Sequence, residues 1–501
     1  MSKVAIVLFV KNEITDISFW IAWHFHCGFD SLIIYDDYST DGTWELLSEA
    51  SQVLDIRLHR AVKADQFNHR QNFSYMNALE KYRKEFDWLL YLDSDEYLDI
   101  RNGENVHDFL ERYPRANAIA LSWCCYGSNC HAVRPPSSNV FRNYPMHSNQ
   151  DFEYNYIVKS FIRPKETETK YINPHRFEVK GHYVTVDHKE IQWQKIHPEC
   201  TETLAQWETA RINHYVIRSM AHFVQKVERR VDIRESRSGM HLFNFYDQNH
   251  HYDTISASRY DGMMPYLYAI QNRVNQKYLS LMIATCGRGL NGEIKDWPTY
   301  LEMSFSTYTL RTAHGTSLFA HPKTGRIKHA NTEEVAKENL VPVIALISSK
   351  WPEKVFLTTE KYDLPLFASE DPRVSTILSF QLVQHGKRFS LHNPITGLIA
   401  CALNAEENGV NLEFSRWRVL EWELFEATPS SLKKLEALQM LPSLFSHFLD
   451  VSKLKMIDKK KTADLFTGIF QLLTPEQQNY WKARNQVPDY PWLHRTALLS
   501  V

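Results

Sequence analysis

Four carboxylates lie close together in the segment YLDSDEYLDI, residues 91–100: Asp93, Asp95, Glu96 and Asp99. They follow the apolar run WLLYL, which is typical of a buried strand. Like charges this close repel one another, so the arrangement requires a positive partner. Mg²⁺ and Mn²⁺ bind one or two carboxylates together with substrate phosphates. We therefore predict a divalent cation here that bridges to a diphosphate; a solvated turn is the alternative for the tripeptide Asp-Ser-Asp taken alone.

The elements around this segment alternate between strand and helix. The runs KVAIVLFV, SLIIYDD, LDIRLHRA and DWLLYLD are predicted strands, and helical patterns separate them. Such alternation predicts right-handed crossovers and an open parallel sheet covered by helices. Ligands of such sheets bind at the carboxyl ends of the strands. Three polar clusters follow predicted strands and are expected to meet there: Lys11-Asn12-Glu13, Asp36-Asp37 and Asp93-Ser94-Asp95.

The totals describe an ordinary globular protein. Of the 501 residues, 44% are apolar, and the formal net charge is −2, which excludes a protein that coats nucleic acid or anionic lipid. The seven cysteines form no Cys-x-x-Cys pair, so we expect reduced thiols and a cytoplasmic location. No stretch reaches the roughly 18 apolar residues of a spanning helix, so we expect no transmembrane segment and at most peripheral membrane contact.

The pattern changes twice along the chain. We expect an α/β domain at 1–275, an all-β domain at 300–428 and a helical region at 429–501. If the all-β domain binds sugar, Trp417, Trp422 and His392 are candidate contacts, although such residues are also typical of cores and turns.

An internal repeat supports the all-β assignment. LFAHPKTGRIKHA (318–330) and FSLHNPITGLIACA (389–402) resemble each other, and their Thr-Gly pairs begin 72 residues apart. A degenerate middle copy fits at 351–385. Three such units predict a β-trefoil; a sandwich or barrel with a chance similarity is the alternative.

Six segments in order carry a resemblance to a known family. They are FVKNEITDISFWIAWHFHCGFDSLIIYDDYSTDGTWELL, YLDSDEYL, YGSNCHAVRPP, VKSFIRP with NPHRF, INHYVIRSMAHFVQKVERR and NFYDQNHHYD. Over about residues 3–260 the chain resembles the glycosyltransferases of the GT-A fold in the family 2-like and family 92-like group. The resemblance implies a Rossmann-like domain that moves a sugar from a nucleotide-sugar, above all a UDP-sugar, to an acceptor hydroxyl with inversion.

The resemblance also implies the metal ligands, which are Asp93, Asp95 and His214. An imidazole ligand favours Mn²⁺ over Mg²⁺. The alternative for His214 is a core histidine at the start of a helix.

The donor pocket implied by the resemblance comprises Lys11, Asn12, Glu13, Asp37, Arg70, Gln71, Ser94 and Arg218. Arg218 stands where the family has lysine, and a cation there would neutralise the departing diphosphate. Asp36 could replace Asp37 as the residue that binds the base or ribose. Positions near the diphosphate or acceptor, with structural roles equally open, are Lys159, Arg163 and His175.

Inversion requires a carboxylate base beside the acceptor hydroxyl, which contributes roughly 10²–10⁴ in rate. The candidates are Asp151, Glu153 and Asp187. We favour Asp187 slightly for its distance along the chain from Asp95, without excluding the others.

Two other functions are compatible with parts of the sequence. The first is a non-catalytic carbohydrate-binding protein with a degenerate transferase domain, against which the intact YLDSDEYL and HYVIR segments argue. The second is a nucleotidyltransferase, which needs a glycine-rich loop after the first strand, where FVKNEITD has no glycine. By family analogy we expect a glycan or glycolipid acceptor in bacterial polysaccharide synthesis and no nucleic-acid partner.

Overall fold

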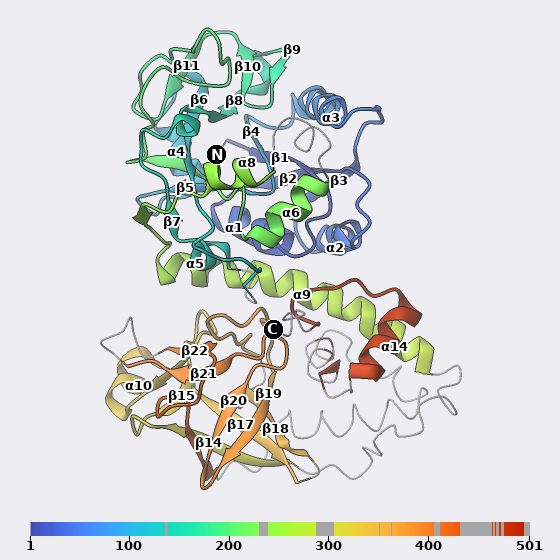
Figure 1. The fold of residues 1–501 in the computed structure, drawn as a ribbon, viewed down its shortest axis with the longest axis vertical. Coiled ribbons are helices and arrows are strands. Elements are labelled where there is room, and N and C mark those ends of the chain that lie inside the picture. Colours follow the sequence, from blue (N-terminus) through green and yellow to red (C-terminus); the bar gives the residue numbers. More distant parts are fainter. Residues whose placement is uncertain are drawn as a thin grey trace. The chain divides into compact units, whose positions relative to one another are not determined.

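The computed structural model (Figure 1) describes residues 2–135, 139–229, 239–286, 305–349, 351–361, 363–404, 411–430, 463, 466, 470–471 and 475–494. The chain divides into two compact units, Met1–Tyr266 and Leu267–Val501. The expected limits at 275 and 300 stay predictions. Most of the expected helical region at 429–501 lies outside the described residues.

A nine-stranded sheet forms the centre of the first unit. Its strands are β1 Val4–Val10, β2 Ser31–Asp36, β3 Ile56–Arg60, β4 Trp88–Leu92, β5 Glu96–Ile100, β6 Ala116–Cys125, β8 Val158–Ile162, β11 His182–Thr185 and β12 Ala210–His214. They follow the order β3-β2-β1-β4-β8-β6-β12-β5, and β11 pairs with β6. The first four strands in this order are parallel, whereas β8 runs antiparallel to β4 and β6. The predicted α/β fold is confirmed, with antiparallel strands added to its parallel half.

Helices and two small two-stranded sheets, β9–β10 and β7–β13, complete the first unit. They are α1 Ile17–His26, α2 Thr43–Ala50, α3 Phe67–Tyr82, α4 Val106–Glu111, α5 Val140–Asn143, α6 Met220–Arg229, α8 Gly239–Tyr246 and the first turns of α9 Ala257–Cys286, whose remainder belongs to the second unit, the 3₁₀ turns η1 Glu153–Tyr156 and η2 Pro164–Glu166, and the strands β7 Met146–His147, β9 Thr167–Asn173, β10 Arg176–Val179 and β13 His251–Tyr252. Every residue of β1 is buried, as expected for a strand covered on both faces. Tyr75 and Leu79 of α3 join the core cluster on the face of Ala5 and Val7.

The strand directions bring several polar residues to one edge of this sheet. Strands β1, β2 and β4 are parallel and in register, with Val10 beside Asp36 and Leu8 beside Leu92. Strand β8 runs the opposite way, so its first residues lie at this same edge. Strand β12 is parallel to β6 and ends here with His214. The carboxyl edge is therefore the place where the predicted clusters meet.

Three non-glycine residues near this edge have left-handed backbone conformations. Asn12 follows β1 with φ 54°, Tyr38 follows β2 with φ 53°, and Arg218 follows β12 with φ 50°. Side chains other than glycine rarely adopt this conformation, and it persists where the surrounding structure holds it. At Asn12 the holding contacts are a hydrogen bond from its backbone N–H to Oγ of Ser39 at 2.9 Å and one from the Thr40 backbone N–H to its Oδ1 at 2.8 Å.

The second unit contains a ten-stranded sheet. The strands are β14 Phe305–Thr312, β15 Ser317–Ala320, β16 Ile327–Ala330, β17 Val341–Ser348, β18 Trp351–Thr359, β19 Leu378–His385, β20 Arg388–His392, β21 Ile399–Ala402, β22 Leu412–Arg416 and β23 Phe425–Pro429. Strand β23 pairs with both β14 and β20, which closes β14-β17-β18-β19-β20-β23 into a ring. The hairpins β15–β16 and β21–β22 extend from this barrel. The predicted all-β, trefoil-like domain is confirmed.

The sequence repeat is also a repeat in structure. In the first copy the backbone N–H of Gly325 donates to the carbonyl of His321 at 2.9 Å, and in the second Gly397 donates to Asn393 at 2.9 Å. Both glycines are left-handed, with φ 77° and 74°. The turn chemistry of the Thr-Gly pairs thus produces the same hairpin twice.

Replacement of Gly325 by alanine is expected to destabilise the second unit more than replacement of Gly386. Both glycines have positive φ, so each substitution costs about 1–2 kcal/mol. At Gly325 a Cβ would also lie 1.7 Å from the carbonyl oxygen of Pro365, whereas nothing lies within 4 Å at Gly386. Overpacking adds about 1–3 kcal/mol. Urea unfolding of the full-length variants measures the difference, and equal losses would contradict the turn geometry.

The remaining described helices of the second unit are α10 Thr332–Glu338 and α14 Pro475–Asn485. Within this unit the segment after α14 packs on the part of α9 that follows Tyr266, where Nε1 of Trp492 donates to Oδ1 of Asn275 at 3.1 Å and the hydroxyls of Tyr278 and Tyr490 lie 3.1 Å apart. None of the helices in the described ranges combines the length and apolarity needed to cross a lipid bilayer.

Candidate active site

Asp93 lies at the carboxyl end of β4 between a lysine and a glutamine. Its Oδ2 accepts a hydrogen bond from Nζ of Lys159 at 2.9 Å, and its Oδ1 accepts one from Nε2 of Gln71 at 3.2 Å. Lys159 is the second residue of β8 and is fully buried, with its Nζ also 3.2 Å from Oε2 of Glu96. The structure thus brings together three residues that the sequence singled out.

Asp95, two residues further on, lies beside a histidine and a second lysine. Its Oδ1 is 3.8 Å from Nε2 of His214, and its Oδ2 accepts a hydrogen bond from Nζ of Lys226 at 2.6 Å. Burial alone would raise the pKa of Asp95, but the neighbouring charges, Lys226 first, hold it below the usual range. Burial lowers the pKa of His214 to about 4. Asp95 is therefore an anion beside a neutral imidazole.

The other two carboxylates of the segment also have cationic partners. Glu96 lies next to Lys159, although burial raises its pKa to about 8. Asp99 lies 2.6 Å from Nη1 of Arg259 and 2.9 Å from Nη1 of Arg101. Lysines and arginines of the chain itself therefore relieve the repulsion that the sequence implied. The divalent cation stays a prediction.

The predicted nucleoside side of the site centres on Asp37. Arg70 donates to both of its carboxylate oxygens, at 2.7 and 2.9 Å, and Nζ of Lys11 lies 3.3 Å from Oδ2. Asp36 pairs with Arg60, and both aspartates are buried, Asp36 at 0% and Asp37 at 1% exposure. The exposed ring of Tyr38 lies next to this pair, with the Arg60 guanidinium 5.6 Å from its centroid. An exposed aromatic face beside a carboxylate can stack a nucleobase.

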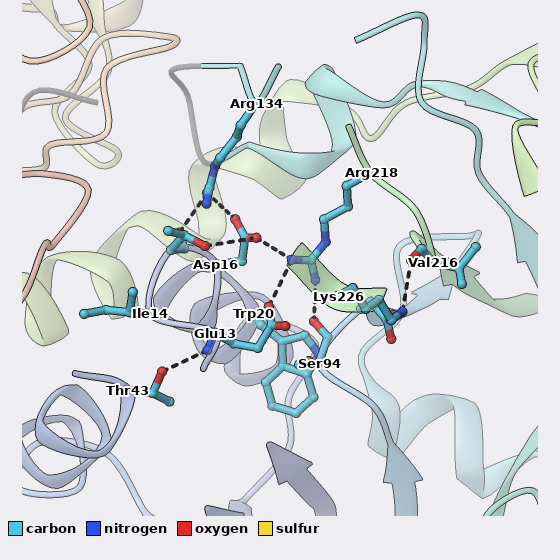
Figure 2. Close-up of polar contacts among 12 residues, drawn as sticks. Glu13, Ile14, Asp16, Trp20, Thr43, Ser94, Arg134, Val216, Arg218 and Lys226 are labelled. Carbon is cyan, nitrogen blue, oxygen red and sulfur yellow. Dashed lines mark hydrogen bonds and ion pairs between the residues drawn. The ribbon is translucent and has the colours of Figure 1, made fainter. Parts of the chain in front are cut away.

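Figure 2 shows a second polar cluster, centred on Arg218. Its Nη1 donates to Oε2 of Glu13 at 3.0 Å and to Oδ2 of Asp16, and its Nη2 donates to the carbonyl oxygen of Ser94 at 3.1 Å. Arg134 donates to the other oxygen of Asp16. Burial would lower the pKa of Arg218, but the carboxylates Asp16 and Glu13 raise it above the usual value. The cluster connects the ends of β1, β4 and β12 through one buried guanidinium.

The three candidate bases lie in different places. Asp187 follows β11, where Nζ of Lys189 is 2.7 Å from its Oδ2 and Thr185 donates to it. Its neighbour Val186 accepts a hydrogen bond from Tyr113, which precedes β6, so the segment lies toward the opposite edge of the sheet. Its role as base stays a prediction that this position does not favour.

Asp151 and Glu153 are exposed and lie nearer the carboxyl edge. Glu153 begins η1, and in the same turn Oδ1 of Asn155 accepts a hydrogen bond from the backbone N–H of Cys125, the last residue of β6. Both remain candidates. Arg163 follows β8 and donates to the carbonyl of Ala116 at the start of β6, so it lies at the opposite edge. The half-buried His175 stacks edge-on against Trp123, and its Nδ1 faces the carbonyl oxygen of Val158.

Sequence reasoning missed four residues of the site: Tyr38, Asp16, Arg134 and Lys226. Asp16 had a signal, since an aspartate before a helical pattern is a typical N-cap. It stands at the N-cap of α1 but makes no capping hydrogen bond and pairs with arginines instead. Lys226 lies in α6, and no local pattern in the sequence indicates that it faces Asp95.

A divalent cation fits the residues present. The carboxylate of Asp95 and the neutral imidazole of His214 lie together, and Nδ1 of His214 is buried without a partner. No group of three or more His, Cys, Asp or Glu side chains in the described ranges is arranged to hold a metal ion. The three predicted ligands Asp93, Asp95 and His214, all within the described ranges, therefore do not form such a group, and Asp93 is instead engaged by Lys159 and Gln71.

Comparison with known proteins gives a family for the first unit. Residues 4–253 match the family model of glycosyltransferase family 92. No characterised protein with a curated description matches the sequence.

Three solved structures show low identity to the chain. Residues 1–349 of Staphylococcus aureus TarS are 13% identical, with 60% of this chain and 78% of that chain covered at a TM-score of 0.26. HddC from Yersinia pseudotuberculosis is 14% identical over 37% of this chain and 91% of its own, at a TM-score of 0.23. The designed threefold-symmetric protein ThreeFoil is 12% identical, with 25% of this chain and 99% of that chain covered at a TM-score of 0.17.

Proposed function

Residues 4–253 are a glycosyltransferase family 92 domain, and from this premise we propose that the protein transfers a sugar from a nucleotide-sugar to an acceptor hydroxyl in a reaction that depends on a divalent cation. The observation that carries the proposal is the pair Asp95 and His214, 3.8 Å apart at the carboxyl edge of the sheet. Asp93 and Asp37 follow β4 and β2, the two strands that flank β1, at the same edge.

Each group at this edge has a part in the proposed reaction. Asp95 and His214 would hold the cation, which supplies Lewis acidity to the leaving diphosphate. Arg70 and Lys11 orient Asp37, whose carboxylate accepts hydrogen bonds from the base or ribose. Lys159 holds Asp93 in place. These contacts orient the donor before the chemical step.

Inversion of the anomeric carbon is part of the proposal. The acceptor oxygen attacks as the bond to the diphosphate oxygen breaks, and a carboxylate takes the acceptor proton. The transition state has oxocarbenium character, as in other glycosyl chemistry. Asp151 and Glu153 are better placed than Asp187, since they lie near the carboxyl end of β6. Replacement of each by its amide tests them separately.

The donor and acceptor are proposed at the level of class. We favour a UDP-sugar with Mn²⁺; the TarS domain named above has also been solved in complex with UDP. For the acceptor we propose a glycan or glycolipid of a bacterial polysaccharide, made in the cytoplasm. The six cysteines with described side chains are free thiols, which supports a reducing compartment.

One observation favours a second function, sugar binding by the trefoil. Of the three candidate contacts, Trp417 is 61% exposed, and an exposed tryptophan face can stack on a sugar ring. Trp422 packs against His314, and Nε2 of His392 lies 2.9 Å from Oγ of Ser390, so both are engaged within the domain. Trp417→Ala should weaken glycan binding and leave donor hydrolysis unchanged.

A donor panel tests the proposed function. Full-length protein is incubated with Mn²⁺ and UDP-, GDP- and dTDP-linked sugars, and the released nucleoside diphosphate is measured. We expect release from one donor class and loss of that release when EDTA removes the cation, because the leaving diphosphate then lacks its counter-charge. Release that persists in EDTA would contradict the metal dependence. The absence of release together with no calorimetric binding of UDP or Mn²⁺ would favour a non-catalytic carbohydrate-binding protein.

A further inference from the structure

Three cations of the described chain lie next to the Asp-x-Asp segment, and they differ in what surrounds them. Arg218 is 2% exposed and Lys159 is fully buried, whereas the side chain of Lys226 is 23% exposed. Both terminal nitrogens of Arg218 are engaged by Glu13, Asp16 and the Ser94 carbonyl. Lys159 lies between Asp93 and Glu96. Of these three cations, only Lys226 both donates a hydrogen bond to Asp95 and is accessible to solvent.

The helix that carries Lys226 is anchored independently of this lysine. At the start of α6 the backbone N–H groups of Met220 and Ala221 donate to the carbonyls of His131 and Ala132, at 3.0 and 2.9 Å. Phe223 of the same helix packs against Phe243 of α8, with ring centroids 5.5 Å apart. Because the helix is fixed by these contacts, the four-carbon stem of Lys226 can move without moving the backbone.

The ammonium of Lys226 occupies one oxygen of the carboxylate that is expected to bind the cation. Its Nζ is 2.6 Å from Oδ2 of Asp95 and 3.0 Å from the carbonyl oxygen of Val216, while Oδ1 faces His214. A lysine and a divalent cation on one carboxylate repel each other strongly in a partly buried site. When the donor binds, its diphosphate brings negative charge to the same place, which offers the ammonium a new partner.

From this geometry we infer that Lys226 is an exchanging cation of the active site. It neutralises Asp95 in the protein without donor and pairs with the leaving diphosphate in the protein with donor. The family resemblance assigned the pairing with the leaving diphosphate to Arg218. In this proposal Arg218 is instead a positioning residue that holds the Ser94 carbonyl and Asp16 at the start of α1. The inference rests on the proposed function and identifies the residue that stabilises the leaving group.

Replacement of Lys226 by methionine should have two opposite effects. Mn²⁺ should bind the protein without nucleotide about fivefold to tenfold more tightly, because a competing ion pair is gone. Turnover should fall by about 10²–10³-fold and UDP should inhibit more weakly, because the leaving diphosphate loses a charge-assisted partner. Lys226→Arg keeps the charge and should restore most of the turnover. A merely structural lysine would not tighten Mn²⁺ binding.

The experiment uses the full-length protein. Binding of Mn²⁺ alone is followed by electron paramagnetic resonance, UDP binding by inhibition of donor turnover, and folding by thermal unfolding. Glu228→Gln, an exposed change on the same helix, is the matched control and should behave as the wild type. If the wild type is active but Lys226→Met binds Mn²⁺ no more tightly than the wild type, the inference about Lys226 is overturned and the proposed function still stands. A wild type that binds neither Mn²⁺ nor UDP would overturn the proposed function as well.

Discussion

Replacement of Asp95 by asparagine is expected to lower the rate of sugar transfer by about a thousandfold. The change keeps the shape of the side chain but removes the charge that lies beside His214 and Lys226. A divalent cation would lose its carboxylate ligand, and the leaving diphosphate would lose much of its counter-charge. The measurement is the release of nucleoside diphosphate from the active donor under saturating Mn²⁺.

Asp108→Asn provides the matched control for this substitution. Asp108 is exposed in the first turn of α4, and its replacement should leave turnover within about twofold, since exposed substitutions rarely change stability by more than about 0.5 kcal/mol. If Asp95→Asn retains more than a tenth of the wild-type rate while remaining folded, the cation is not held at Asp95. The metal ligands would then have to be sought elsewhere at the carboxyl edge.

Replacement of Arg218 by methionine is expected to destabilise the protein by about 3–5 kcal/mol, because it removes a buried cation from two carboxylates, the buried Asp16 and the half-buried Glu13. Asp16 would keep Arg134, but Glu13 and the Ser94 carbonyl would lose the Arg218 partner shown in Figure 2. Residue 218 would also keep its unfavourable positive φ, but without the side-chain contacts that stabilise this backbone conformation. Thermal unfolding should show a loss on the order of 10 °C in the transition of the first unit.

Arg57→Met is the control for this substitution, because it removes the same charge and the same number of carboxylate contacts from a more exposed site. Arg57 also pairs with two carboxylates, Asp55 and Glu85, but its side chain is 38% exposed, against 2% for Arg218. Such a surface pair contributes about 0–1 kcal/mol, so its loss should shift the unfolding temperature by only a few degrees. Equal effects of the two substitutions would show that the Arg218 cluster does not hold the carboxyl edge together.

The sequence was informative where one local pattern leads to one structure. The seven apolar residues of β1 are buried on both faces, as their continuous run predicts. The Thr-Gly pairs 72 residues apart form the same turn, because only a left-handed residue closes it and glycine adopts that conformation readily. The placement of Asp93 and Asp95 at a strand end followed from the alternation of strands and helices.

The sequence was less informative where the partner of a charge comes from far along the chain. Arg218 was assigned to the diphosphate, yet its contacts are Glu13, Asp16 and Ser94, which are more than 120 residues away. Asp187 was favoured as the base for its distance along the chain. Strand β11 runs parallel to β6, but the turn that follows β11 places Val186 beside Tyr113, which precedes β6.

By itself, then, the sequence determined the α/β class of the first unit, the all-β class of the second and the edge at which the carboxylates gather, because hydrophobic periodicity and turn residues act over short distances. Only the tertiary structure decided which lysine or arginine pairs with which carboxylate. Lys159 of β8 and Lys226 of α6 reach Asp93 and Asp95 through an antiparallel strand and a packed helix. Ion pairs form wherever folding places opposite charges within reach, and no local pattern in the chain encodes that placement.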